Sequence, residues 1–270
     1  MAVTFSADGV TCVVLEDGGG GLPADAMFGG APVAERDAAL GERLQADGRV
    51  LHPYGCLLVR TSGMVVLVDT GLGPYDHPYG GSGGRLEAEL DHHGLVPADV
   101  DVLVVTHGHL DHIGGLCRDG APRFVRARHL MSEEAHRWWT DPANVPRMST
   151  IGARVAREQL PPVDMELTGP GEEVAAGIRL LDAPGHSPGQ VAVELGGQAI
   201  YLADAIVDEM HASHPDWAMS FEHDQVAVRR TRRELLGRAA DEGLLVAAPH
   251  LRYAATVTRA GDCFALTPRS

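Results

Sequence analysis

A block of histidines follows directly on a stretch of apolar, β-branched residues, and few folds accommodate that combination. DVDVLVV is followed by THGHLDHIGG, residues 106–115. We expect a buried strand to end there, with His107 and His109 in a tight loop and Asp111 and His112 opening a short helix. Three imidazoles and one carboxylate this close together suit a borderline divalent cation. The block therefore predicts a metal site at the end of a strand.

Four ligands so close in sequence cannot all bind one ion, because neighbouring side chains diverge. We therefore expect two ions, one on His107 and His109 and the other on Asp111 and His112. Each ion needs more ligands, and a single histidine after an apolar run is more often structural. Three such residues in series, after half a binuclear site, favour ligation instead. They are His186 in APGHSPGQ, Asp204 in YLADAI and His250 in VAAPHL.

A pattern of strands occurs twice along the chain. Residues 56–70 and 191–206 each contain two apolar strands that are joined by a glycine turn and followed by Asp69 or Asp204. A polar, helical stretch and another buried strand with histidine at its end come after each hairpin. Two similar halves whose strand ends converge predict an α/β fold, a four-layer αββα sandwich with pseudo-two-fold internal symmetry.

The sequence also predicts the outline of the remaining segments. Residues 1–270 are expected to form one domain with halves of roughly 1–165 and 166–270. The expected elements are a strand at 9–15, a glycine-rich loop at 18–21, a weak helix at 34–46, a mobile loop at 71–85, a helical excursion at 132–165 and a helix after 223 that stops at Gly243. The segments 71–85 and 132–165 are expected to form lids or walls of a site.

Composition narrows the function classes. The chain has 37 acidic and 22 basic residues, a net charge of −15, and all of its basic residues are arginine. Lysine Schiff-base chemistry is excluded, and nucleic acid and membranes are disfavoured as partners. Four scattered cysteines without a C-x-x-C pair give neither a disulfide framework nor a thiolate zinc site. With no signal-peptide pattern and no long apolar run, a cytoplasmic protein is expected.

The combination of H-x-H-x-D-H, the later Pro-Gly-His, the strand-end aspartate and the last histidine resembles the metallo-β-lactamase superfamily. The resemblance spans roughly residues 55–250 and implies the αββα sandwich of that type. It implies one metal on His107, His109 and His186, a second on Asp111, His112 and His250, and Asp204 with a hydroxide between them. Asp69 would lie beside the site without binding metal. The implied cofactors are two divalent ions, zinc first, with iron or manganese as alternatives.

A mechanism follows from this resemblance. Two ions about 3.5–4 Å apart lower the pKa of a bridging water and polarise the oxygen under attack. The hydroxide would then be the nucleophile and the metals would stabilise the developing oxyanion, so the resemblance implies no side-chain nucleophile. Asp111 and Asp204 would take part in catalysis through the metals.

Several branches of the superfamily fit less well. Asp204 completes a ligand set that the best-known β-lactamases lack, and His109 stands where flavodiiron proteins have glutamate. The bridging aspartate lies in ADAIV rather than the GDTLF of glyoxalase II, and the acidic charge disfavours the ribonucleases. The stretch HASHPDWAMSFEHDQ, residues 211–225, resembles the lactonase and organophosphate (methyl parathion) hydrolase branch. A lactone, ester or phosphotriester is the expected small-molecule substrate, and homodimerisation is left open.

One position departs from the quorum-quenching lactonases that this chain resembles. Val207 stands three residues after Asp204, where those lactonases have tyrosine. Either His214, the first choice, or His211 or Tyr201 assists the leaving group, or the substrate is not that lactone.

The substrate pocket is expected to include Trp138, Trp139, Met148, Val207 and Trp217, although core packing is equally open for Trp217. Two alternative activities remain at this stage. One is a thioester hydrolase, glyoxalase II-like or acting on a carrier-bound substrate. The other is a mononuclear iron sulfur dioxygenase of the same fold.

Overall fold

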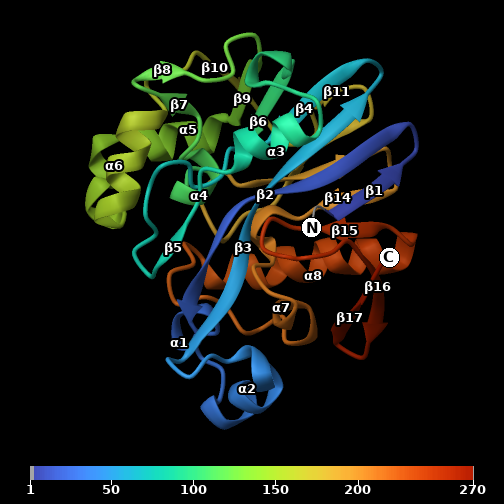
Figure 1. Cartoon of the computed structure of the whole chain (residues 1–270). Coiled ribbons are helices and arrows are strands. Elements are labelled where there is room, and N and C mark those ends of the chain that lie inside the picture. Colours follow the sequence, from blue (N-terminus) through green and yellow to red (C-terminus); the bar gives the residue numbers. More distant parts are fainter. Residues whose placement is uncertain (1–2, 270) are drawn as a thin grey trace.

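A computed structural model describes residues 3–269 and contains two large β-sheets with helices outside both (Figure 1). The first sheet has the order β1 (Val3–Ala7), β2 (Val10–Pro23), β3 (Arg49–Thr61), β4 (Met64–Val68), β6 (Val102–Val105), β9 (Arg128–Ser132) and β10 (Met165–Thr168), and β5 (Gly81–Ser82) pairs with β2. The second has the order β11 (Glu173–Ala175), β12 (Ile178–Asp182), β13 (Val191–Leu195), β14 (Ala199–Tyr201), β15 (Leu245–Ala247), β16 (Ala255–Ala260) and β17 (Cys263–Pro268). A small ribbon joins β7 (Cys117–Arg118) to β8 (Ala121–Pro122).

The α-helices are α1 (Ala24–Met27), α2 (Val33–Leu40), α3 (Leu86–His92), α4 (Leu110–Ile113), α5 (Glu133–Thr140), α6 (Thr150–Gln159), α7 (Met210–Ser213) and α8 (Gln225–Glu242). Four 3-10 turns are η1 (Gly41–Arg43), η2 (Pro97–Asp99), η3 (Pro142–Arg147) and η4 (Ala203–Ala205). Within residues 3–269, no helix has both the length and the apolar character that a membrane crossing needs.

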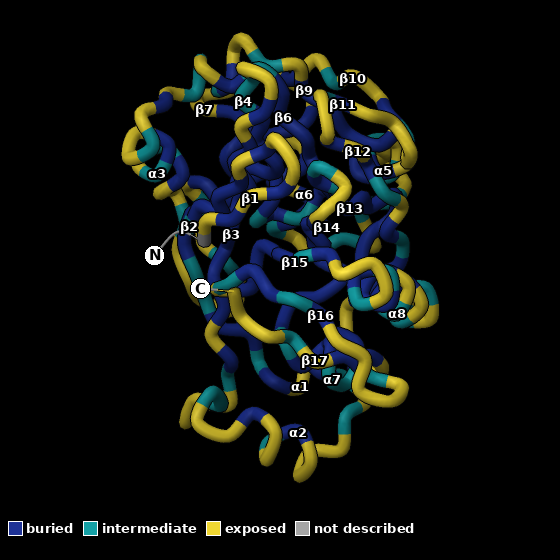
Figure 2. Tube along the Cα trace, turned by 90° about the vertical axis from the view of Figure 1, so that its right-hand side faces the viewer, coloured by how far each residue is buried: buried dark blue, intermediate teal, exposed yellow. Residues whose placement is uncertain are grey.

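The two sheets share a core because strand side chains alternate between faces. Along β3, Leu57 and Val59 pack between the sheets with Val193 and Tyr201 of the second sheet. Leu58 points the other way, toward the core formed with helices α3 to α6. The second sheet packs its outer face against α8. Figure 2 shows the buried strands between more exposed helices and loops. This arrangement confirms the predicted four-layer αββα sandwich.

Both sheets repeat one local topology. In the first, β4 pairs antiparallel with β3 and parallel with β6; in the second, β14 pairs antiparallel with β13 and parallel with β15. In each sheet, the loops that follow the two parallel strands begin at the same edge, where the carboxyl ends of those strands lie. The predicted hairpins at 56–70 and 191–206 correspond to these repeats, and α8 ends at Glu242, directly before Gly243, as expected.

Two sequence expectations near the amino terminus were wrong. The glycines of residues 18–21 lie inside the long strand β2 instead of forming a loop. A Cβ atom at Gly18 would overlap the backbone oxygen of Ser82, so glycine lets β5 lie against β2. The helix expected at 34–46 ends at Leu40, because Gly41 adopts a φ of +53° that interrupts regular helix.

The loop at 71–85 is tied to the first sheet by Asp17. The strand register shifts between Glu16 and Gly18, so Asp17 is the extra residue of a β-bulge. Its fully buried carboxylate accepts hydrogen bonds from the backbone N–H groups of Leu72, Gly73, Gly84 and Leu86. The composition of this loop suggested mobility, and the structure shows that both of its ends are hydrogen-bonded to the buried Asp17 carboxylate.

Candidate metal centre

The predicted ligands gather at one edge of the two sheets. Asp69 and His107 follow the parallel strands β4 and β6, whereas Asp204 and His250 follow β14 and β15. Because the carboxyl ends of parallel strands meet at one edge, these four residues are brought close although the chain separates them widely. His109 directly precedes α4, which carries Asp111 and His112, and His186 lies between β12 and β13.

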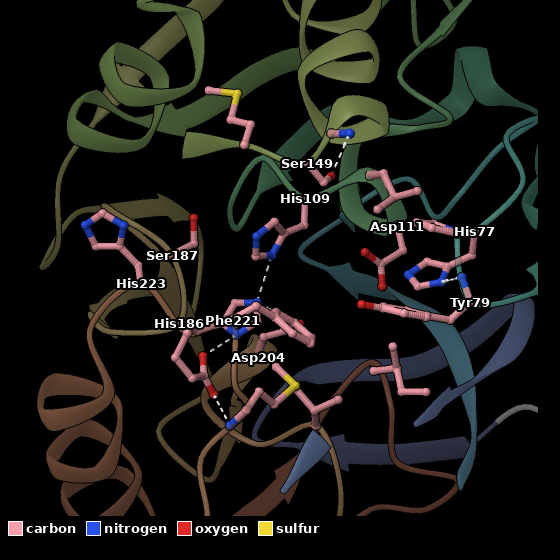
Figure 3. Close-up of a pocket in the computed structure, with 18 of the residues that line it drawn as sticks. His77, Tyr79, His109, Asp111, Ser149, His186, Ser187, Asp204, Phe221 and His223 are labelled. Carbon is pink, nitrogen blue, oxygen red and sulfur yellow. Dashed lines mark hydrogen bonds and ion pairs between the residues drawn. The ribbon is translucent and has the colours of Figure 1, made fainter. Parts of the chain in front are cut away.

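All seven predicted ligands come together in two adjoining groups. His107, His109, His186 and Asp204 form one group, and Asp111, His112 and His250 form the other. Within each group the potential ligand atoms all lie within 4.8 Å of one another. Nε2 of His186 is 2.8 Å from Nδ1 of His109, and Nε2 of His107 is 2.9 Å from the same nitrogen. Figure 3 shows His109, His186 and Asp204 converging in this way.

Asp204 lies between the two groups. Its Oδ2 atom is 3.3 Å from Nε2 of His186 in the first group and 3.4 Å from Nε2 of His250 in the second. Its Oδ1 atom is 3.3 Å from Nε2 of His112. One carboxylate could therefore bind an ion in each group at once.

The outer nitrogens of the imidazoles are held by hydrogen bonds. Nδ1 of His112 is 2.8 Å from Oδ2 of Asp69, and Nδ1 of His186 is 2.8 Å from Oε2 of Glu222. Nδ1 of His250 is 2.7 Å from the carbonyl oxygen of Pro53. Since these oxygens can only accept, each Nδ1 donates, and each Nε2 faces the cluster as the nitrogen available to a metal.

Asp69 shapes the site without entering either group. Its Oδ1 atom accepts the backbone N–H of Thr106 at 2.8 Å, and its Oδ2 atom accepts from His112. Its φ of +64° is unusual for a residue with a side chain, and such strain is concentrated at functional sites. Asp69 therefore fixes the orientation of His112, in the position that the resemblance implied.

The donor set fits divalent cations. Nε2 of His112 and Oδ1 of Asp204 are buried, and although they lie 3.3 Å apart, neither has a well-formed hydrogen bond among residues 3–269. Unpaired buried polar atoms are costly, and a bound cation would satisfy both of them. Histidine nitrogens with aspartate oxygens are the ligands that zinc and similar ions take.

Electrostatics point the same way. Burial and the neighbouring His112 and His109 hold the pKa of His107 well below its usual range. Burial also opposes a charge on His112, yet Asp204, Asp69 and Asp111 raise the pKa of His112 well above its usual range. The carboxylates thus stabilise positive charge inside the cluster, and a divalent cation would supply that charge.

A cavity of about 530 Å³ opens beside both groups. Trp138, Trp139, Met148 and Val207 line it, where the sequence placed them. Both tryptophans contribute to the lining. Trp138 is half-buried, and Trp139 packs edge-on against His109, with ring centroids 5.1 Å apart.

Trp217 does not line this cavity, so its expected place in the pocket is corrected. Its side chain is buried in a small apolar cluster with Phe28 and Met210. His214 stacks on its outer side, with ring centroids 3.8 Å apart.

His214 also lies outside the cavity, which corrects its expected role as proton donor. Its Nδ1 atom bonds with Ser213, and its Nε2 atom is 3.9 Å from Glu35. The two other candidates are turned away as well. His211 bonds with the carbonyl oxygen of Met27, and the hydroxyl of Tyr201 lies 3.5 Å from the carbonyl oxygen of Gly55.

Sequence reasoning missed several residues at the site. Glu222 holds His186, and the cavity is also lined by His52, His77, Tyr79, Arg147, Phe221 and His223. His77 and Tyr79 belong to the loop 71–85, which was expected to form a wall, so that signal was present. Glu222 lies inside the stretch 211–225, but nothing local links it to a histidine 36 positions earlier.

Replacing Glu222 with glutamine is expected to weaken Zn²⁺ binding by about ten- to one-hundred-fold. The amide keeps the size of the side chain but cannot stabilise the N–H of His186 with a negative charge. Competition against a chromophoric chelator measures the affinity. Glu234→Gln, on the exposed face of α8, is the matched control, and equal affinities in the two variants would show that Glu222 does not support the site.

Comparison with known proteins agrees with this geometry. The model of the metallo-beta-lactamase superfamily matches residues 53–250, a span that contains all seven predicted ligands. The chain belongs to the metallo-beta-lactamase superfamily.

One relative is metallo-beta-lactamase domain-containing protein 1 of Xenopus laevis, 31% identical over 160 residues. The match covers 59% of this chain and 53% of that protein, so the chain spans about half the length of the curated relative it matches.

Solved structures show the same fold. The hydrolase AbOPH of the beta-lactamase superfamily superposes with a TM-score of 0.89 at 21% identity, over 100% of this chain and 97% of that one. AidC, described as a dizinc quorum-quenching lactonase, gives 0.86 at 22% identity over the same shares. A probable metal-dependent hydrolase from Staphylococcus aureus gives 0.82 at 19%, over 98% and 99%. At these identities the likeness establishes the fold.

Proposed function

We propose that this protein is a hydrolase that binds two divalent ions, zinc first, and cleaves a lactone, an ester or a phosphotriester, as in the lactonase and organophosphate hydrolase branch. The observation that carries the proposal is Asp204, whose carboxylate lies between the two ligand groups beside the cavity. His107, His109 and His186 would hold one ion and Asp111, His112 and His250 the other. Residues 1–270 would form one domain, and the substrate would be a small molecule.

The residues of the chain have distinct tasks in this proposal. When bound, the two ions would lower the pKa of a water between them and polarise the scissile carbonyl or phosphoryl group. Asp69 and Glu222 keep His112 and His186 in the tautomers that face the cluster. Trp138 and Trp139 provide an apolar wall that holds the substrate and excludes water from the reacting bond.

The test is a metal count together with a substrate panel. Mass spectrometry of zinc-reconstituted protein is expected to show about two ions per chain. Hydrolysis of lactones, aryl esters and aryl phosphotriesters should be lost with a chelator and restored by zinc. At most one metal in a fully reloaded sample would contradict the dinuclear site. One iron with thiol oxidation, or turnover of thioesters alone, would favour the corresponding alternative activity.

The panel should show a preference that depends on the leaving group. Aryl esters and aryl triesters are expected to exceed acyl-homoserine lactones in kcat/KM. Nitrophenolate is a stable anion that can leave without being protonated, whereas the alkoxide released from a lactone needs a proton. Val207 lines the cavity, and the three alternative donors are turned away from it. Val207→Tyr should narrow the gap, whereas Val207→Phe, which adds the ring without the hydroxyl, should not. A wild type that strongly prefers the lactone, or equal effects of the two variants, would contradict this account.

A further inference from the structure

One guanidinium group lines the cavity beside the proposed metal centre. Arg147, the last residue of η3, contributes to the lining, and its guanidinium carbon lies 5.8 Å from the ring centroid of Trp138. Across residues 3–269, no carboxylate oxygen lies within 4.0 Å of its nitrogens. Most other arginines of this acidic chain are ion-paired, such as Arg128 with Glu166, and Arg147 differs from the remaining unpaired ones in lining the cavity. Arg147 therefore presents an uncompensated positive charge to the cavity.

Two aromatic side chains accompany Arg147 in the lining. The indole ring of Trp138 lies beside the Arg147 guanidinium, and its N–H is buried rather than open to the cavity. His223 also lines the cavity (Figure 3). Its ring meets that of Trp138 edge-on, with centroids 5.7 Å apart. The wall thus offers one positive charge with two aromatic side chains beside it.

The guanidinium fork and the single charge favour one class of ligand. The parallel N–H groups match the two oxygens of a carboxylate, and because the described lining residues include no second arginine or lysine, a singly charged group is favoured over a phosphate dianion. The apolar surfaces of Trp138, Trp139 and Met148 suit a hydrocarbon chain that leads to such a group.

We propose that Arg147, with Trp138 and His223, binds a carboxylate at the end of the substrate remote from the scissile bond. The substrate class is then an ester or lactone whose acyl chain ends in a free carboxylate. This inference rests on the proposed hydrolase function for the reacting bond but makes its own prediction about selectivity. Arg147 is a specificity residue and takes no part in breaking the bond.

The test compares two series of 4-nitrophenyl esters on the zinc-reconstituted enzyme. One series carries half-esters of linear dicarboxylic acids of six to ten carbons, and the other carries the matching monocarboxylic esters. A preference for the half-ester should peak at one chain length, because Arg147 is fixed relative to the reacting bond. Arg147→Gln should lower kcat/KM for that half-ester about five- to twenty-fold, through KM, since the side chain is exposed. The neutral esters should change less than about twofold.

Two further variants make the comparison specific. Arg157→Gln removes the same charge from an exposed position on α6 outside the cavity lining and should leave both series unchanged. Arg147→Lys keeps the charge and should recover part of the half-ester activity. Equal losses in both ester series, or an unchanged half-ester KM in Arg147→Gln, would overturn the carboxylate subsite.

A binding measurement separates this inference from the proposed reaction. Adipic acid monoamide, which carries a carboxylate and resists hydrolysis, should quench tryptophan fluorescence, and Arg147→Gln should weaken its binding by at least about fivefold. Hexanamide, of the same length without the carboxylate, should bind both proteins alike. If no ester is cleaved but this difference is found, the subsite stands and the proposed reaction is wrong. Quenching that is identical in wild type and Arg147→Gln would reject the subsite whatever the activity.

Discussion

Replacing Asp204 with asparagine should reduce the protein to at most about one metal ion per chain and lower kcat/KM by at least about one-hundred-fold. The side chain keeps its size, so the packing around it is preserved. The charge that lies between His112, His186 and His250 is lost, and an amide nitrogen cannot bind a cation. Neither ion would then share a negatively charged ligand with the other.

Metal content by mass spectrometry and hydrolysis of an aryl ester measure the two effects separately. Asp216→Asn is the matched control, because Asp216 is exposed and pairs with Arg233 away from the cavity. Two ions and full activity in Asp204→Asn would show that another group joins the metals.

The second large effect concerns folding. Asp17→Asn should lower the free energy of unfolding by about 3–5 kcal/mol, because buried N–H groups lose their acceptor and an amide N–H is turned toward them. For a chain of this size the loss corresponds to a fall in Tm of roughly 6–15 °C. Circular dichroism during heating and urea titration gives both quantities.

Asp8→Asn is the control, since Asp8 is exposed at the turn between β1 and β2. Loop 71–85, which carries His77 and Tyr79 to the cavity, depends on Asp17 for its attachment. The folded variant should therefore also show faster proteolysis in this loop. Stability within about 0.5 kcal/mol of the control would mean that the bulge does not hold the loop.

Much of the ligand set could be predicted because its signals are local. An apolar run followed by H-x-H-x-D-H predicts a strand end with ligands, and the same reasoning located His186, Asp204 and His250. Hydrophobic periodicity likewise predicted α8 and both hairpins, since burial of one face is a property of the segment itself. The resemblance then supplied the grouping of the ligands, which spacing alone left open.

Side chains that act across long separations could not be predicted in this way. Glu222 contacts His186, and Asp17 contacts the loop 71–85, only because distant segments pack together. His214 and Trp217 looked suited to the pocket by composition, but the local backbone stacks them on each other outside it. The glycines of β2 have the composition of a loop, but they lie in a strand whose Gly19 and Gly20 pair with β5.

The sequence by itself therefore determined the sandwich and the set of candidate metal ligands, because strand periodicity and ligand type are carried by short segments. The tertiary structure alone decided which side chains support the ligands and which of them face the cavity. Those outcomes depend on the direction in which each side chain leaves a packed backbone, and that direction is set by residues far away in the chain. Arg147 shows the difference most clearly: its sequence context marks an ordinary surface arginine, and its position makes it the guanidinium of the cavity wall.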